Sequence, residues 1–119
     1  MGEDREQLFR DIYDGFNRRD VDAVLAALHP DVDWPNAWEG GRVRGHAEVR
    51  EYWRRQFAEI DPSVEPVRFD ATGDGRIAVT VHQVVRALDG SLLADREVTH
   101  VYTLRDGLVV RMDVTEEPD

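Results

Sequence analysis

The side chains best suited to do chemistry in this sequence are a histidine and a tyrosine from opposite halves of the chain. His100 lies between Val98 and Tyr102 in an alternating run, which predicts that all three share one face of a strand. A histidine there can titrate near neutral pH and exchange a proton with a ligand, or it can be a core residue bonded to Tyr102 or to the backbone. Tyr13 has a phenol that can hydrogen-bond a ligand carbonyl, or pack with its hydroxyl at the rim. We take His100 and Tyr13 as the candidate catalytic residues.

Aromatic residues accompany this pair. The 119 residues include three tryptophans, and aromatic walls suit a flat apolar ligand, although tryptophan also simply fills cores. Trp38 lies in a glycine-rich segment and could act as a lid. The candidate substrate-binding residues are Trp34, Trp53, Phe16, Phe57, His82, Tyr102 and Met112. They predict a pocket for an apolar small-molecule ligand.

Several kinds of catalysis are excluded by composition. The chain has no cysteine, which removes thiolate nucleophiles and thiolate metal sites. It has no lysine, so Schiff-base chemistry is not available. The four histidines are scattered and form no HExxH motif, and the glycines lack a phosphate-loop context. We therefore expect neither a metal nor another cofactor.

The charge of the chain narrows its partners. The net charge of −10 disfavours nucleic acid, because nucleic-acid binders neutralise phosphates with basic surfaces. No apolar stretch is long enough to cross a membrane, and the first residues are charged where a signal peptide needs an apolar core. We expect a cytoplasmic protein with no nucleic-acid or membrane partner.

The first half of the chain must position these residues with helices. Apolar residues recur at helical spacing within residues 4–18 and again within 46–60, where Asp61-Pro62 ends the pattern. Asp20 is typical of a helix N-cap, and the helix after it should stop at His29-Pro30. A short strand is expected at 32–34, followed by a loop from Asn36 to Gly45.

The second half has the two-residue period of strands. Three Asp-Gly pairs separate runs rich in Val, Ile, Thr and Tyr, which predicts hairpins. Strands are expected at about 64–72, 76–87, 92–104 and 108–115, joined as an antiparallel meander. Helices followed by strands predict one α+β domain over residues 1–119, with the helices packed on one face of the sheet.

Alternation then assigns faces, on the premise that residues 88–90 and 105–107 form three-residue loops. The more apolar face is expected inward and collects Ala78, His82, Val84, Ala94, Val98, His100, Tyr102, Val110, Met112 and Val114. The other face collects Val79, Val81, Gln83, Glu97, Thr99, Thr103, Arg111 and Asp113. Two-residue loops would shift this pairing. The mixed outer face could pair with a second subunit, so we expect a homodimer through it.

Four segments resemble one known superfamily. FNRRDVD at residues 16–22 and LHPDVDW at 28–34 resemble the opening of nuclear transport factor 2-like proteins, above all the SnoaL-like and ketosteroid isomerase-like ones. GHAEVREYW at 45–53 is similar to their third helix, and TLRDGLVV at 103–110 to their final hairpin. The resemblance implies a cone-shaped α+β barrel, with a curved sheet wrapped around a helix and a ligand pocket at the open end.

The resemblance also implies what the pocket does. Trp34 stands where the isomerases carry a catalytic acid, His100 replaces their protonated carboxyl, and their oxyanion tyrosine falls at Ile12 or next to it at Tyr13. These departures argue against ketosteroid isomerisation. Two functions stay open: cofactor-independent acid/base catalysis of the isomerase, cyclase or hydrolase type on an apolar oxygen-bearing substrate, as in SnoaL-like polyketide cyclases, or a non-catalytic ligand-binding or dimeric interaction domain.

Overall fold

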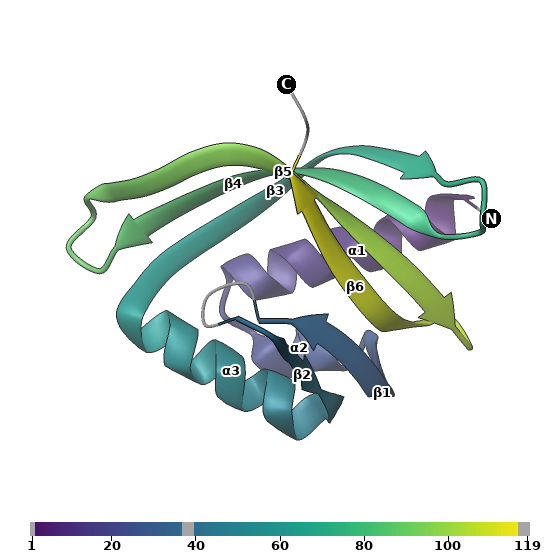
Figure 1. Ribbon diagram of the computed structural model, residues 1–119, viewed down its shortest axis with the longest axis horizontal. Helices are drawn as coiled ribbons and strands as arrows, with labels where there is room; N and C mark the ends of the chain where they lie inside the picture. The colour runs from purple at the N-terminus through teal and green to yellow at the C-terminus, as the bar shows by residue number, and fades with distance from the viewer. Residues whose placement is uncertain (1, 37–39, 117–119) are drawn as a thin grey trace.

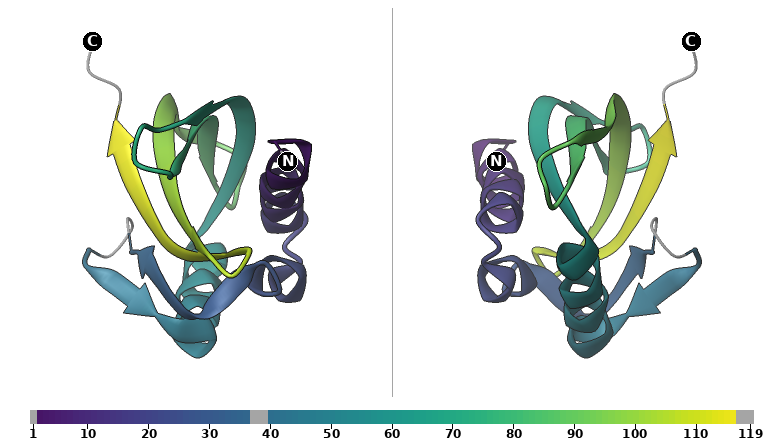
Figure 2. Two further views of the ribbon diagram at one scale, coloured as in Figure 1. Left: turned by 90° about the vertical axis from the view of Figure 1, so that its right-hand side faces the viewer. Right: turned by 90° about the vertical axis from the view of Figure 1, so that its left-hand side faces the viewer.

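Three helices and one curved, six-stranded sheet make up the computed structural model, which describes residues 2–36 and 40–116 (Figure 1). The helices are α1 (Gly2–Asn17), α2 (Val21–Leu25) and α3 (Gly45–Glu59). The strands are β1 (Leu28–Pro35), β2 (Arg42–Arg44), β3 (Ile60–Ala71), β4 (Ile77–Ala87), β5 (Leu92–Arg105) and β6 (Leu108–Glu116). The long strands bend over α1 and α3 (Figures 1 and 2), which confirms the predicted cone-shaped α+β fold.

The first two helices form where their sequence patterns predict them. The predicted stripe of α1 is buried at Phe9, Ile12 and Tyr13, so this face of the helix packs into the core. Asp20 caps α2, since its side chain accepts a hydrogen bond of 3.2 Å from the backbone N–H of Ala23. This helix is shorter than predicted because Leu28 already belongs to β1, where it is buried.

Helix α3 carries the pocket wall that faces the sheet. Its buried residues are Val49, Tyr52 and Trp53, as the helical spacing predicts. The helix ends at Glu59 because Ile60 is already extended, at φ −139° and ψ 166°. The conformational restriction that Pro62 imposes on the residue before it accounts for a helix end at this point.

The sheet combines the predicted meander with an extension that was not predicted. Its order is β2-β1-β6-β5-β4-β3, and β3 to β6 are antiparallel neighbours, as expected. Strand β1 is longer than predicted and pairs with β6 in parallel. The expected loop at 36–45 contains β2, which pairs with β1. Trp38, the predicted lid, lies outside the described residues.

A β-bulge in β5 makes the predicted face of β4 wrong. Arg86 pairs with Leu92, as a three-residue loop requires, but Val85 pairs with Ala94, so Leu93 is an extra residue in β5. One extra residue reverses the faces of everything that follows. On β4 the inward residues are therefore Val79, Val81 and Gln83, and not Ala78, His82 and Val84, as predicted.

In the β5–β6 hairpin, by contrast, two irregularities cancel each other. Its loop is two residues, Asp106-Gly107, both with positive φ (56° and 80°), which glycine adopts without strain. This shorter loop would have reversed the faces of β6, but Val110 is an extra residue in β6 and restores them. His100 and Tyr102 therefore share the inward face with Met112 and Val114 as predicted, although His100 pairs with Val114 and Tyr102 with Met112, two residues from the register that the three-residue loop implies. Near the loop, Val109 and not the predicted Val110 is fully buried.

The core lies between the helices and the concave face of the sheet. Trp53, Tyr102 and Phe9 are its largest fully buried side chains, one from each of α3, β5 and α1. Among the helices that the structure describes, none is both long and apolar enough to cross a membrane.

Candidate functional site

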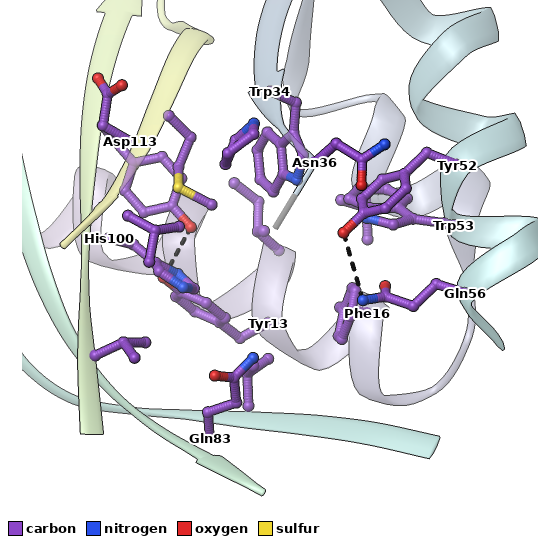
Figure 3. Close-up of a pocket in the computed structure, with 18 of the residues that line it drawn as sticks. Tyr13, Phe16, Trp34, Asn36, Tyr52, Trp53, Gln56, Gln83, His100 and Asp113 are labelled. Carbon is purple, nitrogen blue, oxygen red and sulfur yellow. Dashed lines mark hydrogen bonds between the residues drawn. The ribbon is translucent and has the colours of Figure 1, made fainter. Parts of the chain in front are cut away.

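A cavity of about 460 Å³ opens between α1, α3 and the inner face of the sheet (Figure 3). This size lies in the range of small-molecule pockets. Its apolar lining residues include Ile12, Phe16, Val24, Trp34, Trp53, Val64, Val98, Met112 and Val114. Its polar and charged lining residues include Tyr13, Asn36, Arg42, Tyr52, Gln56, Gln83, Arg96, His100, Tyr102 and Asp113.

A chain of two hydrogen bonds joins the residues predicted to do chemistry. The hydroxyl of Tyr102 lies 2.7 Å from that of Tyr13, which lies 2.9 Å from Nδ1 of His100. Tyr13 comes from α1, while the other two are alternate residues of β5. The prediction that His100 and Tyr102 share an inward face therefore holds, and the structure brings Tyr13 to them.

Burial fixes the direction of this chain. Tyr102 is 0% exposed, and among the described residues its hydroxyl has Tyr13 as its hydrogen-bond partner. A buried hydroxyl without an acceptor is costly, so Tyr102 donates to Tyr13. Tyr13 must then donate to Nδ1 of His100, which therefore carries no proton. The neutral imidazole holds its proton on Nε2.

Nε2 of His100 is the end of the chain that a ligand can reach. Within residues 2–36 and 40–116, no buried side-chain nitrogen or oxygen lacks a hydrogen-bond partner. The described residues supply no hydrogen-bond partner for Nε2, so this atom is not fully buried, and His100 lines the cavity. The site thus presents an N–H donor to whatever the cavity holds.

Burial also keeps the three groups uncharged. Desolvation lowers the pKa of His100 to about 4, so the imidazole is neutral at neutral pH. Desolvation raises the pKa of Tyr13, and the neighbouring Tyr102 raises it further. Desolvation likewise raises the pKa of Tyr102. The expectation that His100 titrates near neutral pH is therefore wrong for the unliganded protein, and the group is suited to donating a hydrogen bond without carrying charge.

Aromatic rings form part of the cavity wall. Trp34 meets Trp53 edge-on, with ring centroids 5.5 Å apart, and Phe16 contacts Trp53 at 5.7 Å. Met112 completes this lining from β6. Phe57 packs against Phe16 at 5.2 Å and is not among the residues that line the cavity. With Tyr102, the structure thus places five of the predicted substrate-binding residues at the cavity and Phe57 behind its wall.

His82 was predicted to contact substrate and lies on the opposite face of the sheet. The bulge at Leu93 turns it outward, where its Nε2 lies 2.6 Å from a carboxylate oxygen of Asp95. The hydrogen bond to Asp95 raises the pKa of His82. Sequence alternation alone cannot detect a bulge, so nothing in the pattern would have corrected this assignment.

Several polar residues of the cavity were missed or misplaced by the sequence analysis, including Asp113, which was assigned to the outer face. Gln83 was assigned outward for the same reason as His82. Asn36 was expected in a loop, and Gln56 was not singled out. The signal for Gln56 was its helical spacing, since it lies four residues after the buried Tyr52 and so on the same side of α3. Its amide donates to the Tyr52 hydroxyl over a long 3.4 Å.

Arg42 holds the cavity wall that carries Trp34. Its guanidinium donates to the carboxylate and to the backbone carbonyl of Asp33, and to the carbonyl of Met112 at 2.6 Å. It also pairs with Asp113 at 3.2 Å. Burial raises the pKa of Asp33, but the hydrogen bond from Arg42 and the positive charges of Arg42, Arg111 and Arg44 together outweigh burial, so the pKa is lowered. One side chain thereby ties β2 to β1 and β6.

Metal ligands are not gathered at this site. Over the part of the chain that the structure describes, no group of three or more His, Asp or Glu side chains could hold a metal ion. Asp113 is the one carboxylate among the described lining residues, and both Arg42 and Arg111 pair with it. The cavity therefore combines apolar walls with neutral hydrogen-bonding groups and with the charged side chains of Arg42, Arg96 and Asp113.

Comparison with known proteins places this fold and cavity in a family. The SnoaL-like domain model matches residues 9–112. The chain belongs to the SnoaL-like domain family. This SnoaL-like protein is 31% identical to a nuclear transport factor 2-like protein of unknown function from Burkholderia pseudomallei, with a TM-score of 0.82 over 96% of this chain and 91% of that one. A search of curated proteins finds no match.

Two further solved structures resemble this SnoaL-like protein. TerC, co-crystallized with polyporic acid, is 28% identical, with a TM-score of 0.82 over 96% of this chain and 92% of that one. A putative polyketide cyclase from Xanthomonas campestris pv. campestris is 24% identical, with a TM-score of 0.76 over 94% of this chain and 89% of that one, and this likeness is one of fold alone. The predicted superfamily is thereby confirmed.

Proposed function

We propose that this SnoaL-like protein binds an apolar, oxygen-bearing small molecule in its cavity, and that His100 donates a hydrogen bond from Nε2 to an oxygen of that molecule. The observation that carries the proposal is the one-way chain from Tyr102 through Tyr13 to Nδ1. The aromatic walls favour a flat ligand. The likeness to TerC, co-crystallized with polyporic acid, supports a small-molecule ligand.

The same hydrogen bond defines the catalysis that we propose. A donor aimed at a carbonyl oxygen stabilises the negative charge that develops there in enolisation or cyclisation, and it acts more strongly where water is excluded. A neutral imidazole suffices for this role. Such polarisation needs no cofactor and fits a reaction of the isomerase or cyclase type. We assign no general base, because Asp113 is held by Arg42 and Arg111.

A second candidate is ligand binding without turnover. It is favoured by the engaged state of Asp113, and by Trp34, which stands where the resemblance implies a catalytic acid. Both candidates share the donor at His100. They differ in whether the bound ligand reacts.

The test compares α-tetralone with tetralin, the same bicyclic frame without the carbonyl. We expect the wild-type protein to bind α-tetralone about 3- to 10-fold more tightly than tetralin, which is the worth of one hydrogen bond. His100→Gln should keep much of this preference, since a glutamine amide can also donate, and His100→Phe should lose it. Amide NMR titrations give the affinities. Equal preference in all three proteins would refute the role of His100.

Two readouts then separate the candidates. Polarisation should lower the carbonyl stretching frequency of bound α-tetralone in difference infrared spectra of the wild type, and His100→Phe should abolish the shift. Turnover should accelerate exchange of the protons next to the carbonyl with D₂O, followed by NMR. Binding with an infrared shift but no faster exchange would favour the ligand-binding function.

A further inference from the structure

Hydrogen-bonding groups also line the wall of the cavity across from His100. Tyr52 and Gln56 come from α3, and Figure 3 shows them on the side of the cavity opposite to His100 and Tyr13. The rings of Trp34 and Trp53 lie along the cavity wall and are buried. The cavity therefore has two polar ends joined by an aromatic middle.

The second end can both donate and accept. The amide nitrogen of Gln56 donates to the hydroxyl of Tyr52 at 3.4 Å, at the long limit for a hydrogen bond. An amide has two N–H donors and one carbonyl acceptor, so one donor and the acceptor of Gln56 are not used by that contact. Gln56 is half-buried, so a ligand that replaces water at this amide can gain a direct hydrogen bond.

The two ends of the cavity differ in the ligand groups with which they can hydrogen-bond. His100 offers an N–H, which requires an acceptor such as a carbonyl or a phenolate oxygen. Gln56 can take a hydroxyl through its carbonyl, or a carbonyl through its N–H. A ligand with an oxygen at one end alone would leave the other polar wall facing apolar surface, which costs free energy.

On the basis of the proposed function, we infer that the ligand of this protein is a flat ring system with oxygen at both ends: a carbonyl oxygen that His100 binds and, across the ring, a hydroxyl or carbonyl oxygen that Gln56 binds. Gln56 is then a residue that determines specificity. Gln83 also lines the cavity but lies on β4, on the sheet side, and so provides a matched control.

The experiment adds one hydroxyl to the same probe. 4-Hydroxy-1-tetralone carries a hydroxyl across the ring from the ketone of α-tetralone, and we expect the wild type to bind it about 3- to 10-fold more tightly. Gln56→Met, which keeps the length of the side chain and removes its polar atoms, should abolish that gain, measured as the ratio of the affinities of the same variant for the two tetralones. Gln83→Met should keep the gain. Amide NMR spectra show whether each variant is folded.

The outcomes are distinct. If α-tetralone binds through His100 but the added hydroxyl gives no gain, or if Gln56→Met keeps the gain, the second end is refuted and the proposed function stands. If Gln83→Met removes the gain as fully as Gln56→Met does, Gln56 is not the specific partner, and the inference is wrong. If neither tetralone binds the wild type, the proposed function fails for this ligand class, and the inference falls with it.

Discussion

The hydrogen-bond chain predicts that Tyr102→Phe destabilises the wild-type protein but stabilises the Tyr13→Phe variant. In the wild type, Tyr102→Phe removes one donor to Tyr13, while Tyr13 still donates to His100. The Tyr13 hydroxyl keeps His100 as its partner, so this substitution leaves no buried polar group without a hydrogen bond. The net loss should be that of one hydrogen bond, about 0.5–1.5 kcal/mol in the free energy of unfolding.

Tyr13→Phe should cost more, because it leaves two buried groups without partners. Nδ1 of His100 loses its donor, and the hydroxyl of Tyr102, 0% exposed, loses its acceptor. Each orphaned group costs about 1–3 kcal/mol, so we expect a loss of about 2 kcal/mol or more. In that background Tyr102→Phe removes one of the two orphans. It should therefore raise the free energy of unfolding by about 1 kcal/mol.

The assay is urea denaturation at pH 7.5 of the wild type, both single variants and the double variant, followed by tryptophan fluorescence. Equal slopes of free energy against urea would show that the same surface is exposed in all four proteins. The double-variant cycle gives the coupling of the two hydroxyls directly. If Tyr102→Phe destabilises the Tyr13→Phe protein as much as it destabilises the wild type, the direction derived for the chain is wrong.

Three further predictions concern other parts of the molecule. Burial lowers the pKa of His100 from 6.5 to about 4, so between these pH values the unfolded chain binds a proton that the folded chain does not. The free energy of unfolding should therefore fall by up to about 3 kcal/mol as the pH is lowered from about 6.5 to 4. Urea titrations should show that His100→Gln removes this part of the pH dependence, and an unchanged dependence would contradict the prediction. Arg42→Met should lower the free energy of unfolding by about 1–3 kcal/mol, since it removes hydrogen bonds to Asp33 and Met112 that join three strands. Urea denaturation measures the loss, and a change under about 0.5 kcal/mol would show that these hydrogen bonds contribute little to stability. We propose that the outer sheet face forms a homodimer, so sedimentation should give twice the mass of the chain, and Val101→Arg in the middle of that face should give a folded monomer; a monomeric wild type would refute the dimer.

The sequence patterns predicted the elements well where local signals decide them. The stripe of α1 and the Asp-Gly hairpins depend on residues close together in the chain, and these elements formed where expected. The convergence of Tyr13 with His100 followed from the family resemblance and from strand alternation. On the neighbouring strand, a two-residue loop would have reversed the faces of β6, and the bulge at Val110 restored them, which keeps Met112 on the same face as His100.

The failures have two physical origins, a bulge and a pairing between distant residues. A bulge inserts a single residue and reverses a face, and residues 91–96 contain no glycine or proline that would mark the bulge at Leu93. This misplaced His82 and Gln83 together. Strand β2 was missed because its three residues pair with β1, which the sequence pattern predicted too short. The hydrogen bond that holds β2 to β6 runs from Arg42 to the carbonyl of Met112, about 70 positions away in the sequence.

The direct test of the account is the protonation of His100 in the free protein. Nitrogen-15 NMR of a uniformly labelled sample at pH 7.5 distinguishes an imidazole protonated on Nε2 from one protonated on Nδ1 and from the imidazolium. We expect a neutral ring with its proton on Nε2, because Tyr13 donates to Nδ1. A ring protonated on Nδ1, or charged at this pH, would contradict the claim that the site offers a hydrogen-bond donor to its ligand.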